Sequence, residues 1–300
     1  MILIMGGFLF LVVKVGGIKI EKALVYDKHT LRDTYPYGKT VRFFQWDKIS
    51  AKLDSLTTLE EVATEFGALN NYKNRNGLAP LADSVRKDAY KALVDKYGIK
   101  RDQSVPLYRP GNLSVPECYG QDGSLVWILR DTADYVVVVP AFFKGVWLVP
   151  SKYVDRLNVR YFRKLIGVDR TQQHVVTLER TDTAWLVRSM NPATTGIRRP
   201  PYRRPTPPGV YVVRAKVKQM LFLKDGGKGM GGYAPWATRF SGGAYIHGVP
   251  VNYPQKKVYE FAWTLGTTPR SHMCVRNATS HAKFIYDWAP VDSSLVVVFN

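Results

Sequence analysis

The sequence predicts a mainly β protein of the α+β class. Two features carry that expectation: β-branched runs such as Val136–Val139 and Leu295–Val298, and many aromatic residues, with 18 Tyr and 13 Phe. Both favour strands over helices. The 300 residues, 46% of them hydrophobic, suffice for two or three compact units with buried cores, which excludes global disorder.

The chain is strongly basic, with 43 Lys and Arg against 24 Asp and Glu and a formal net charge of +19. Such a charge attracts anionic partners by general electrostatics. Nucleic acid, acidic lipid and a carboxylate-bearing cell-wall polymer all fit that description. No nucleic-acid-binding motif or basic helix is recognisable, so we expect no nucleic acid partner.

The first residues, Met1–Val13, are entirely apolar, and Lys14 ends the run. The run is shorter than the ~20 residues that span a bilayer. It suits the core of a signal peptide better, although the charged n-region is missing. We interpret residues 1–20 as a signal sequence or membrane anchor, with residues 1–18 as the anchoring part. A buried first strand is the alternative. The protein is then exported to the periplasm or cell envelope, where an uncleaved segment would hold it on the inner membrane.

Residues 21–101 are expected to form a helical N-terminal region. Thr58 and Glu61 have the spacing of a capping box, which predicts a helix continuing through Phe66. A second helix is predicted from Leu81 to Tyr97, because apolar residues recur there at helical spacing and Gly98 follows as a stop signal.

Residues 102–158 have the texture of short strands, and the segment Asp131–Asp134 (DTAD) between two apolar runs predicts a hairpin turn. This order of strands, with a closing Gly-x-Trp and Tyr-Val, resembles the bacterial Src-homology-three-like barrel found in cell-wall enzymes. An unrelated hairpin that packs on the next domain is the alternative.

The last region, residues 173–300, follows a link at residues 151–173. A strand hairpin is predicted from His174, a strand from Val210, and a helix after Asn277 as its cap, with Phe284, Ile285 and Trp288 inward. Four arginines crowd the Pro-rich loop before Val210, where they form either a solvated surface or a carboxylate-binding edge: Arg198, Arg199, Arg203 and Arg204.

The chain has two cysteines, Cys118 and Cys274. So small a number of cysteines in an exported protein favours a free, functional thiol over a structural disulfide, although a disulfide between the two is an alternative. A thiol becomes a nucleophile as the thiolate, and a nearby imidazole can take its proton. His272 is the candidate nearest in sequence and His247 is a candidate from another strand. A zinc site made of these three residues lacks a fourth ligand, so we expect no metal.

Three strings together resemble the L,D-transpeptidase (YkuD-like) catalytic domain family: Ile246–Gly248 (IHG), Ser271–Asn277 (SHMCVRN) and Arg203–Val213 (RRPTPPGVYVV). The family pattern is a histidine in His-Gly or His-Ser, then [Ser/Thr]-His-Gly-Cys with Arg or Asn two residues on, and an upstream Thr-Pro-x-Gly. The match covers roughly residues 173–299. Two departures stand out: Met273 replaces the family's glycine, and the segment between His247 and Ser271 is longer than usual.

The resemblance implies a β-sandwich catalytic domain and a peptidoglycan L,D-transpeptidase that needs no cofactor. Cys274 would be the nucleophile and His247 the base. The backbone N–H groups of Met273 and Cys274 would bind the oxyanion. The expected supporting or substrate-binding residues are Ser271, His272, Arg276, Arg239 and Gly248.

The expected partners are peptidoglycan stem peptides, and carbapenem-type inhibitors would acylate Cys274. Two alternatives remain: a cell-wall cysteine peptidase or carboxypeptidase, and a non-catalytic peptidoglycan-binding protein. The papain-like order, with the cysteine before the histidine, is the reverse of the order here.

Overall fold

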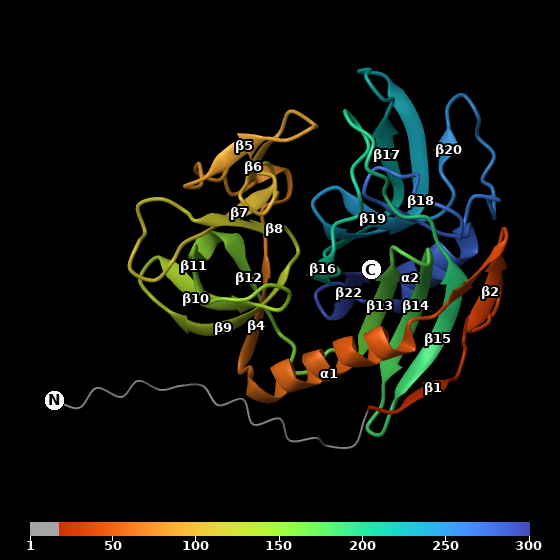
Figure 1. Cartoon of the computed structure of the whole chain (residues 1–300), viewed down its shortest axis with the longest axis horizontal. Coiled ribbons are helices and arrows are strands. Elements are labelled where there is room, and N and C mark those ends of the chain that lie inside the picture. Colours follow the sequence, from red (N-terminus) through yellow and green to blue (C-terminus); the bar gives the residue numbers. More distant parts are fainter. Residues whose placement is uncertain (1–17) are drawn as a thin grey trace.

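A computed structural model describes residues 18–300. The segment interpreted as a signal or anchor therefore lies almost wholly outside the described residues. Within 18–300, neither helix has the length and apolar content needed to cross a bilayer. The expectation of a mainly β fold is confirmed: strands far outnumber the two α-helices (Figure 1).

A six-stranded mixed sheet forms the centre of the molecule, with strand order β1-β15-β14-β13-β22-β16. The strands β13 and β22 run parallel, and β13, β14 and β15 form an antiparallel meander. The bounds are β1 Ile20–Lys22, β13 Lys164–Asp169, β14 His174–Arg180, β15 Trp185–Pro192, β16 Gly209–Val212 and β22 Ser294–Phe299. The sheet thus includes β13, from the segment expected to be a link.

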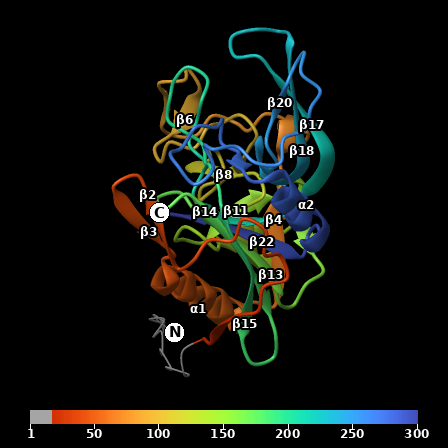
Figure 2. The same cartoon turned by 90° about the vertical axis from the view of Figure 1, so that its right-hand side faces the viewer.

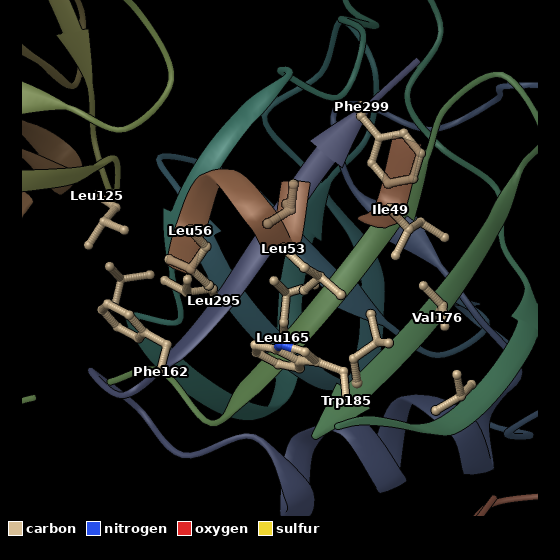
Figure 3. Packing of buried hydrophobic residues seen from close by; sticks show 14 of the residues in the cluster. Ile49, Leu53, Leu56, Leu125, Phe162, Leu165, Val176, Trp185, Leu295 and Phe299 are labelled. Carbon is tan, nitrogen blue, oxygen red and sulfur yellow. The ribbon is translucent and has the colours of Figure 1, made fainter. Parts of the chain in front are cut away.

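Both faces of this sheet are buried, which explains the continuous apolar run of β22. Leu295 and Val297 face the helix α1 (Trp46–Val62), whereas Val296 and Val298 face the other side. On the first face, Leu53 and Leu56 of α1 pack with Leu165 and Trp185 (Figure 3). Alternation along a strand gives each face its own apolar set.

The second face packs against a smaller sheet with order β17-β18-β19-β21 and with β20 on β18. The helix α2 (Thr279–Trp288) closes this layer through Ile285. The bounds are β17 Ala215–Leu223, β18 Met230–Ser241, β19 Ala244–His247, β20 Val251–Asn252 and β21 Val275–Arg276. The long β17–β18 hairpin extends at the end of the molecule far from α1 (Figure 2).

A third, antiparallel sheet has the order β11-β10-β9-β4-β12. The predicted hairpin at Asp131–Asp134 is confirmed as the β9–β10 turn. As paired, the sheet is open, and no closed barrel is identified in residues 18–300. The bounds are β4 Glu65–Leu69, β9 Leu125–Asp131, β10 Tyr135–Pro140, β11 Trp147–Pro150 and β12 Val154–Leu157.

Short two-stranded ladders and two 3₁₀ turns complete the fold. The ladders are β2 Thr34–Tyr37 with β3 Thr40–Phe43, β5 Val85–Lys87 with β6 Leu93–Asp95, and β7 Ser104–Leu107 with β8 Cys118–Gln121; the turns are η1 Tyr72–Asn74 and η2 Ser151–Tyr153. The division of the chain at residues 21–101, 102–158 and 173–300 stays a prediction.

The predicted helix from Leu81 to Tyr97 is wrong, because this segment holds β5 and β6. The side chain of Asp88 accepts the N–H groups of Tyr90 and Ala92. Asp95 likewise accepts those of Tyr97 and Ile99. Such side-chain acceptors compete with helical hydrogen bonds and stabilise turns. The helical region expected over residues 21–101 therefore contains a single α-helix.

That helix also lies elsewhere than predicted. It begins at Trp46 and ends at Val62, so Thr58 sits in its interior and Phe66 belongs to β4. Its buried residues Ile49, Leu53 and Leu56 recur every three or four positions, which places them on one face of the helix. The C-terminal helix α2 is confirmed, but its cap residue is Ala278, and the predicted cap Asn277 instead pairs its side chain with His281.

We predict that Asp95→Ala lowers the free energy of unfolding by about 2–4 kcal/mol. Asp95 is fully buried and accepts three backbone N–H groups, those of Tyr97, Ile99 and Tyr119. Urea unfolding measures the change. The exposed Asp83→Ala serves as the control and should shift stability by under about 0.5 kcal/mol. Equal effects of the two substitutions would contradict the turn-forming role of Asp95.

Candidate active site

The parallel pair β19–β21 brings the two predicted catalytic residues together. Ile246 pairs with Val275, and His247 pairs with Arg276. Because side chains alternate along a strand, His247 and Tyr245 share one face with Arg276 and Cys274. All four line a cleft of about 1270 Å³, whereas Ile246 and Val275 point into the core on the other face.

His247 is oriented to accept a proton. Its side chain is nearly fully buried, and its Nδ1 lies 2.7 Å from the carbonyl oxygen of Gly248. A carbonyl can only accept, so Nδ1 carries the proton and Nε2 keeps its lone pair. Burial and, to a smaller extent, the neighbouring Arg276 charge lower the pKa of His247 to about 4, although the hydrogen bond to Gly248 opposes the shift. The imidazole is therefore neutral at pH 7.

Cys274 is a protonated thiol in the resting site. Burial raises its pKa to about 11, although the Tyr245 N–H and the Arg276 charge oppose that rise. The sulfur lies 3.6 Å from the carbonyl oxygen of Gly243, to which the thiol donates. The nearby start of α2 at Thr279 favours the thiolate, but the effect of burial is larger. The Cys274 thiol and the His247 imidazole are thus both neutral at rest.

The second cysteine has no part in this site. Cys118 lies buried in β8, and both cysteines are free, so no disulfide joins them. Burial raises the pKa of the Cys118 thiol to about 12. Within residues 18–300 there is also no cluster of three or more His, Cys, Asp or Glu side chains arranged to hold a metal ion.

Met273 adopts a backbone conformation that favours glycine. Its φ angle is 73°, in the left-handed region that glycine enters without cost and other residues enter at about 1–2 kcal/mol. Its side chain packs at the edge of the core between the two sheets. The methionine therefore preserves the turn before Cys274 at a modest cost in stability.

The expected oxyanion donors differ in availability. The Met273 N–H donates to the carbonyl oxygen of Arg204 at 2.9 Å, so it is already engaged. The Cys274 N–H has no hydrogen-bond partner within residues 18–300. Of the two, the structure leaves only the Cys274 N–H open for a ligand, because the Arg204 loop occupies the other.

Ser271 and His272 fix the turn rather than approach the sulfur. The Ser271 hydroxyl donates to the carbonyl oxygen of Cys274, and its N–H donates to Thr195. His272 is half-exposed, and its Nε2 lies 2.6 Å from Asp225 in the turn of the β17–β18 hairpin. Of the two histidines, His247 shares a face of the β19–β21 pair with Cys274, whereas His272 lies against Asp225; the role of His247 as base stays a prediction.

Gly248 owes its place to close packing. A Cβ at this position would come within 2.8 Å of the Thr279 side chain and 3.0 Å of Pro235. The absence of a side chain lets the N-terminus of α2 approach β18, which holds His247 next to the helix. Its contribution to the site is structural.

Arg239 was expected to bind substrate, yet its charge is already paired. Its Nη1 lies 2.6 Å from Asp122, and both side chains are almost fully buried. The guanidinium carbon also lies 4.1 Å from the centre of the Tyr72 ring. These two contacts tie β18 to the turn between β8 and β9, which holds Asp122, and to η1, which holds Tyr72. A role of Arg239 in binding carboxylates stays a prediction.

Several cleft residues were missed from the sequence. Tyr72 lies in η1, far away along the chain, and its hydroxyl is 2.9 Å from that of Tyr245. Arg270 also lines the cleft, and its position directly before the Ser271 motif was the one available signal. For Tyr72 no local pattern pointed to the site, because its contact depends on the packing of two distant segments.

The comparisons with known proteins agree with the local chemistry. Residues 163–298 match the family model described as YkuD, the L,D-transpeptidase catalytic domain. No curated protein matches the chain.

Among solved structures, the chain is similar to three mycobacterial enzymes. An L,D-transpeptidase from Mycobacterium smegmatis is 17% identical, with 57% of this chain and 80% of that chain covered and a TM-score of 0.38. One from Mycobacterium tuberculosis H37Rv is 20% identical, with 55% and 72% covered and a TM-score of 0.37. L,D-transpeptidase 3 from Mycobacterium tuberculosis, in complex with a faropenem-derived adduct, is 18% identical, with 56% and 92% covered and a TM-score of 0.36. These overall similarities are weak, and the assignment of residues 163–298 rests on the family model.

We predict that Met273→Gly is more stable than Met273→Ala by about 1 kcal/mol. Both substitutions remove the packing of the methionine side chain, but only glycine also removes the free-energy cost of the left-handed backbone conformation. The same pair at Met220, a partly buried β17 residue whose φ is not positive, should show the reverse order because glycine is unfavourable in strands. Thermal unfolding compares the four variants. If Met273→Ala were more stable than Met273→Gly, the backbone at this position would not be strained.

We predict that iodoacetamide alkylates Cys274 slowly at pH 7, and about tenfold faster for each pH unit up to about pH 10. The raised pKa of the thiol keeps it protonated below about 11, and the thiolate is the nucleophile. Intact mass measured in a Cys118→Ala background reports only Cys274. A rate that is fast and constant from pH 5 to 9 would instead indicate a resting thiolate–imidazolium pair.

Proposed function

We propose, from the premise that residues 163–298 are an L,D-transpeptidase catalytic domain of the YkuD family, that this protein is a peptidoglycan L,D-transpeptidase with Cys274 as its nucleophile. The observation that carries the proposal is the placement of Cys274 and His247 on one face of β19–β21 in a cleft. The donor is a tetrapeptide stem and the acceptor is the side-chain amine of another stem.

The first half-reaction forms a thioacyl-enzyme. The sulfur of Cys274 attacks the carbonyl carbon that joins the third stem residue to D-alanine, while its proton passes to Nε2 of His247. The C–S bond forms, the C–N bond breaks, and the imidazolium returns the proton to the leaving amine of D-alanine. Since thiol and imidazole are both neutral at rest, proton transfer accompanies the attack and no stored ion pair precedes it.

The second half-reaction transfers the acyl group. The acceptor amine attacks the thioester carbon, His247 takes the amine proton, and the thiol is restored as the 3→3 cross-link forms. The negative charge on the carbonyl oxygen in each step requires preorganised donors. The Cys274 N–H supplies one of them, because it is the donor that the resting structure leaves without a partner.

The proposal extends to inhibitors and to the site of action. A carbapenem presents a strained ring carbonyl to the same sulfur, so we expect it to acylate Cys274. We further propose that the protein acts in the cell envelope after export by residues 1–20, where its net charge of +19 favours an anionic wall polymer.

We predict that Cys274→Ala lowers 3→3 cross-linking by about 1,000-fold or more, because the covalent intermediate cannot form. Purified tetrapeptide donor and acceptor are incubated with enzyme, and mass spectrometry identifies D-alanine release and the cross-linked product. The matched control is Cys118→Ala, which removes the other buried thiol and should retain activity. Undiminished cross-linking by Cys274→Ala would refute the catalytic role.

The same assay without an acceptor amine distinguishes the carboxypeptidase alternative. Release of a tripeptide in the absence of acceptor, with no cross-link when acceptor is supplied, would make water the natural acceptor. Absence of any product together with peptide binding would favour the binding protein.

A further inference from the structure

The imidazole of His247 is held by one peptide group. Its Nδ1–H donates to the carbonyl oxygen of Gly248 at 2.7 Å. That carbonyl belongs to the same planar peptide unit as the N–H of Val249, and the two groups point in opposite directions because this peptide is trans. The direction of the Val249 N–H therefore sets the direction of the oxygen that holds the imidazole.

The N–H of Val249 donates to the side chain of Thr279, a buried residue at the start of α2. The Val249 nitrogen lies 3.1 Å from Oγ1 of Thr279. A hydrogen bond at the N–H end of a peptide also makes its carbonyl a better acceptor, because chains of hydrogen bonds polarise one another. The Thr279 hydroxyl thus acts on His247 twice: it fixes the peptide, and it strengthens the bond from Nδ1–H.

The Thr279 hydroxyl is itself oriented by the long segment that follows β20. It donates its proton to the carbonyl oxygen of Tyr259 at 2.6 Å, which leaves a lone pair for the Val249 N–H. The backbone N–H of Thr279 donates to the carbonyl oxygen of Glu260 at 2.8 Å. Two consecutive carbonyl groups therefore hold the threonine in one orientation, and the same segment continues into the wall of the cleft at Leu265.

The hydrogen bond at Nδ1 decides what Nε2 can do. A neutral imidazole carries one proton, so a proton on Nδ1 leaves Nε2 with the lone pair that can take the proton of Cys274. In the other tautomer Nε2 carries the proton, and the imidazole cannot act as a base toward the sulfur. Any group that fixes the Gly248 carbonyl therefore selects the tautomer that the reaction needs.

We propose that Thr279 is a positioning residue for His247: its hydroxyl holds the peptide between Gly248 and Val249 and thereby keeps the imidazole in the Nδ1–H tautomer. Thr279 does not line the cleft, so it acts through His247 and not by contact with the substrate. The expected effect on turnover rests on the proposed function, whereas the tautomer is a property of the resting protein.

Substitutions in the full-length protein isolate the hydroxyl. Thr279→Val keeps the shape of the side chain and removes both of its hydrogen bonds, whereas Thr279→Ser keeps the hydroxyl and removes only the methyl group. The matched control is Thr238→Val. Thr238 is also buried and lies in β18 beside β19, but its hydroxyl has no hydrogen-bond partner within residues 18–300.

Turnover and binding should respond differently. With a tetrapeptide donor and one fixed acceptor amine, we expect Thr279→Val to lower kcat about 10- to 100-fold, because the base is misplaced. Thr279→Ser should stay within about threefold of the wild type, and Thr238→Val should leave kcat unchanged. Calorimetry of the same donor on the Cys274→Ala protein, with and without Thr279→Val, should show affinities that differ by less than about twofold.

Nitrogen-15 NMR of the histidine side chains gives a measurement that needs no turnover. At pH 7 the wild type should show His247 with a protonated Nδ1 and an unprotonated Nε2, and the signals are assigned by their loss in His247→Gln. In Thr279→Val both nitrogens should shift toward a mixture of tautomers. Thr279→Ser and Thr238→Val should keep the wild-type pattern.

The outcomes separate this inference from the proposed function. The positioning role is refuted if the Nδ1–H tautomer persists in Thr279→Val, or if kcat falls no further in this variant than in Thr238→Val; transpeptidation stands in both cases. If the wild type turns over no donor, the proposed function fails and the NMR comparison alone decides the positioning role. Thr279→Ala replaces Thr279→Val, with the same expected results, if the valine variant does not fold.

Discussion

The carboxylate of Asp122 is the contact on which the site depends. It is buried, and it accepts the N–H groups of Asn71 and Gly242 while it pairs with Arg239. One side chain in the turn between β8 and β9 thereby joins the segment after β4 to the turn between β18 and β19. Removing one partner of a buried ion pair typically costs about 3–5 kcal/mol. The carbonyl oxygen of Gly243 in that turn accepts the hydrogen bond from the Cys274 thiol. The location of the sulfur therefore depends on Asp122, which comes from the other half of the chain.

From this anchor the chemistry of the cleft follows. The β19–β21 register places Cys274 and His247 on one face, and their burial makes both neutral. A neutral thiol is protected from stray oxidants and alkylating agents, since the thiolate is the reactive form. Arg270 and Arg276 add a positive field to this cleft, since the Nε atom of each is buried without a partner within residues 18–300.

The sequence revealed the pattern-dependent parts of this structure and missed the contact-dependent ones. Alternating and β-branched runs predicted the β14–β15 hairpin, β16, β22 and the β9–β10 hairpin, and the motif around Cys274 singled out His247 as its partner. The strands β1 and β13 of the central sheet were missed, because they fell in segments expected to be a helical region and a link. The false helix over residues 81–97 shows the limit, because Asp88 and Asp95 override apolar spacing with local hydrogen bonds. The pairing of Arg239 with Asp122 and the approach of Tyr72 to Tyr245 could not be predicted, since each joins residues more than a hundred positions apart.

The left-handed backbone conformation of Met273 shows how the residue at this position can change while the turn before the cysteine is kept. What the turn before the nucleophile requires is a dihedral angle, and glycine is only the least costly residue that provides it. A cost near 1 kcal/mol is small beside the total stability of a protein of this size, so drift away from glycine is tolerated while the turn is retained by its neighbours. A consensus written in residue letters would score this position as a defect, whereas a description written in backbone angles would find it intact.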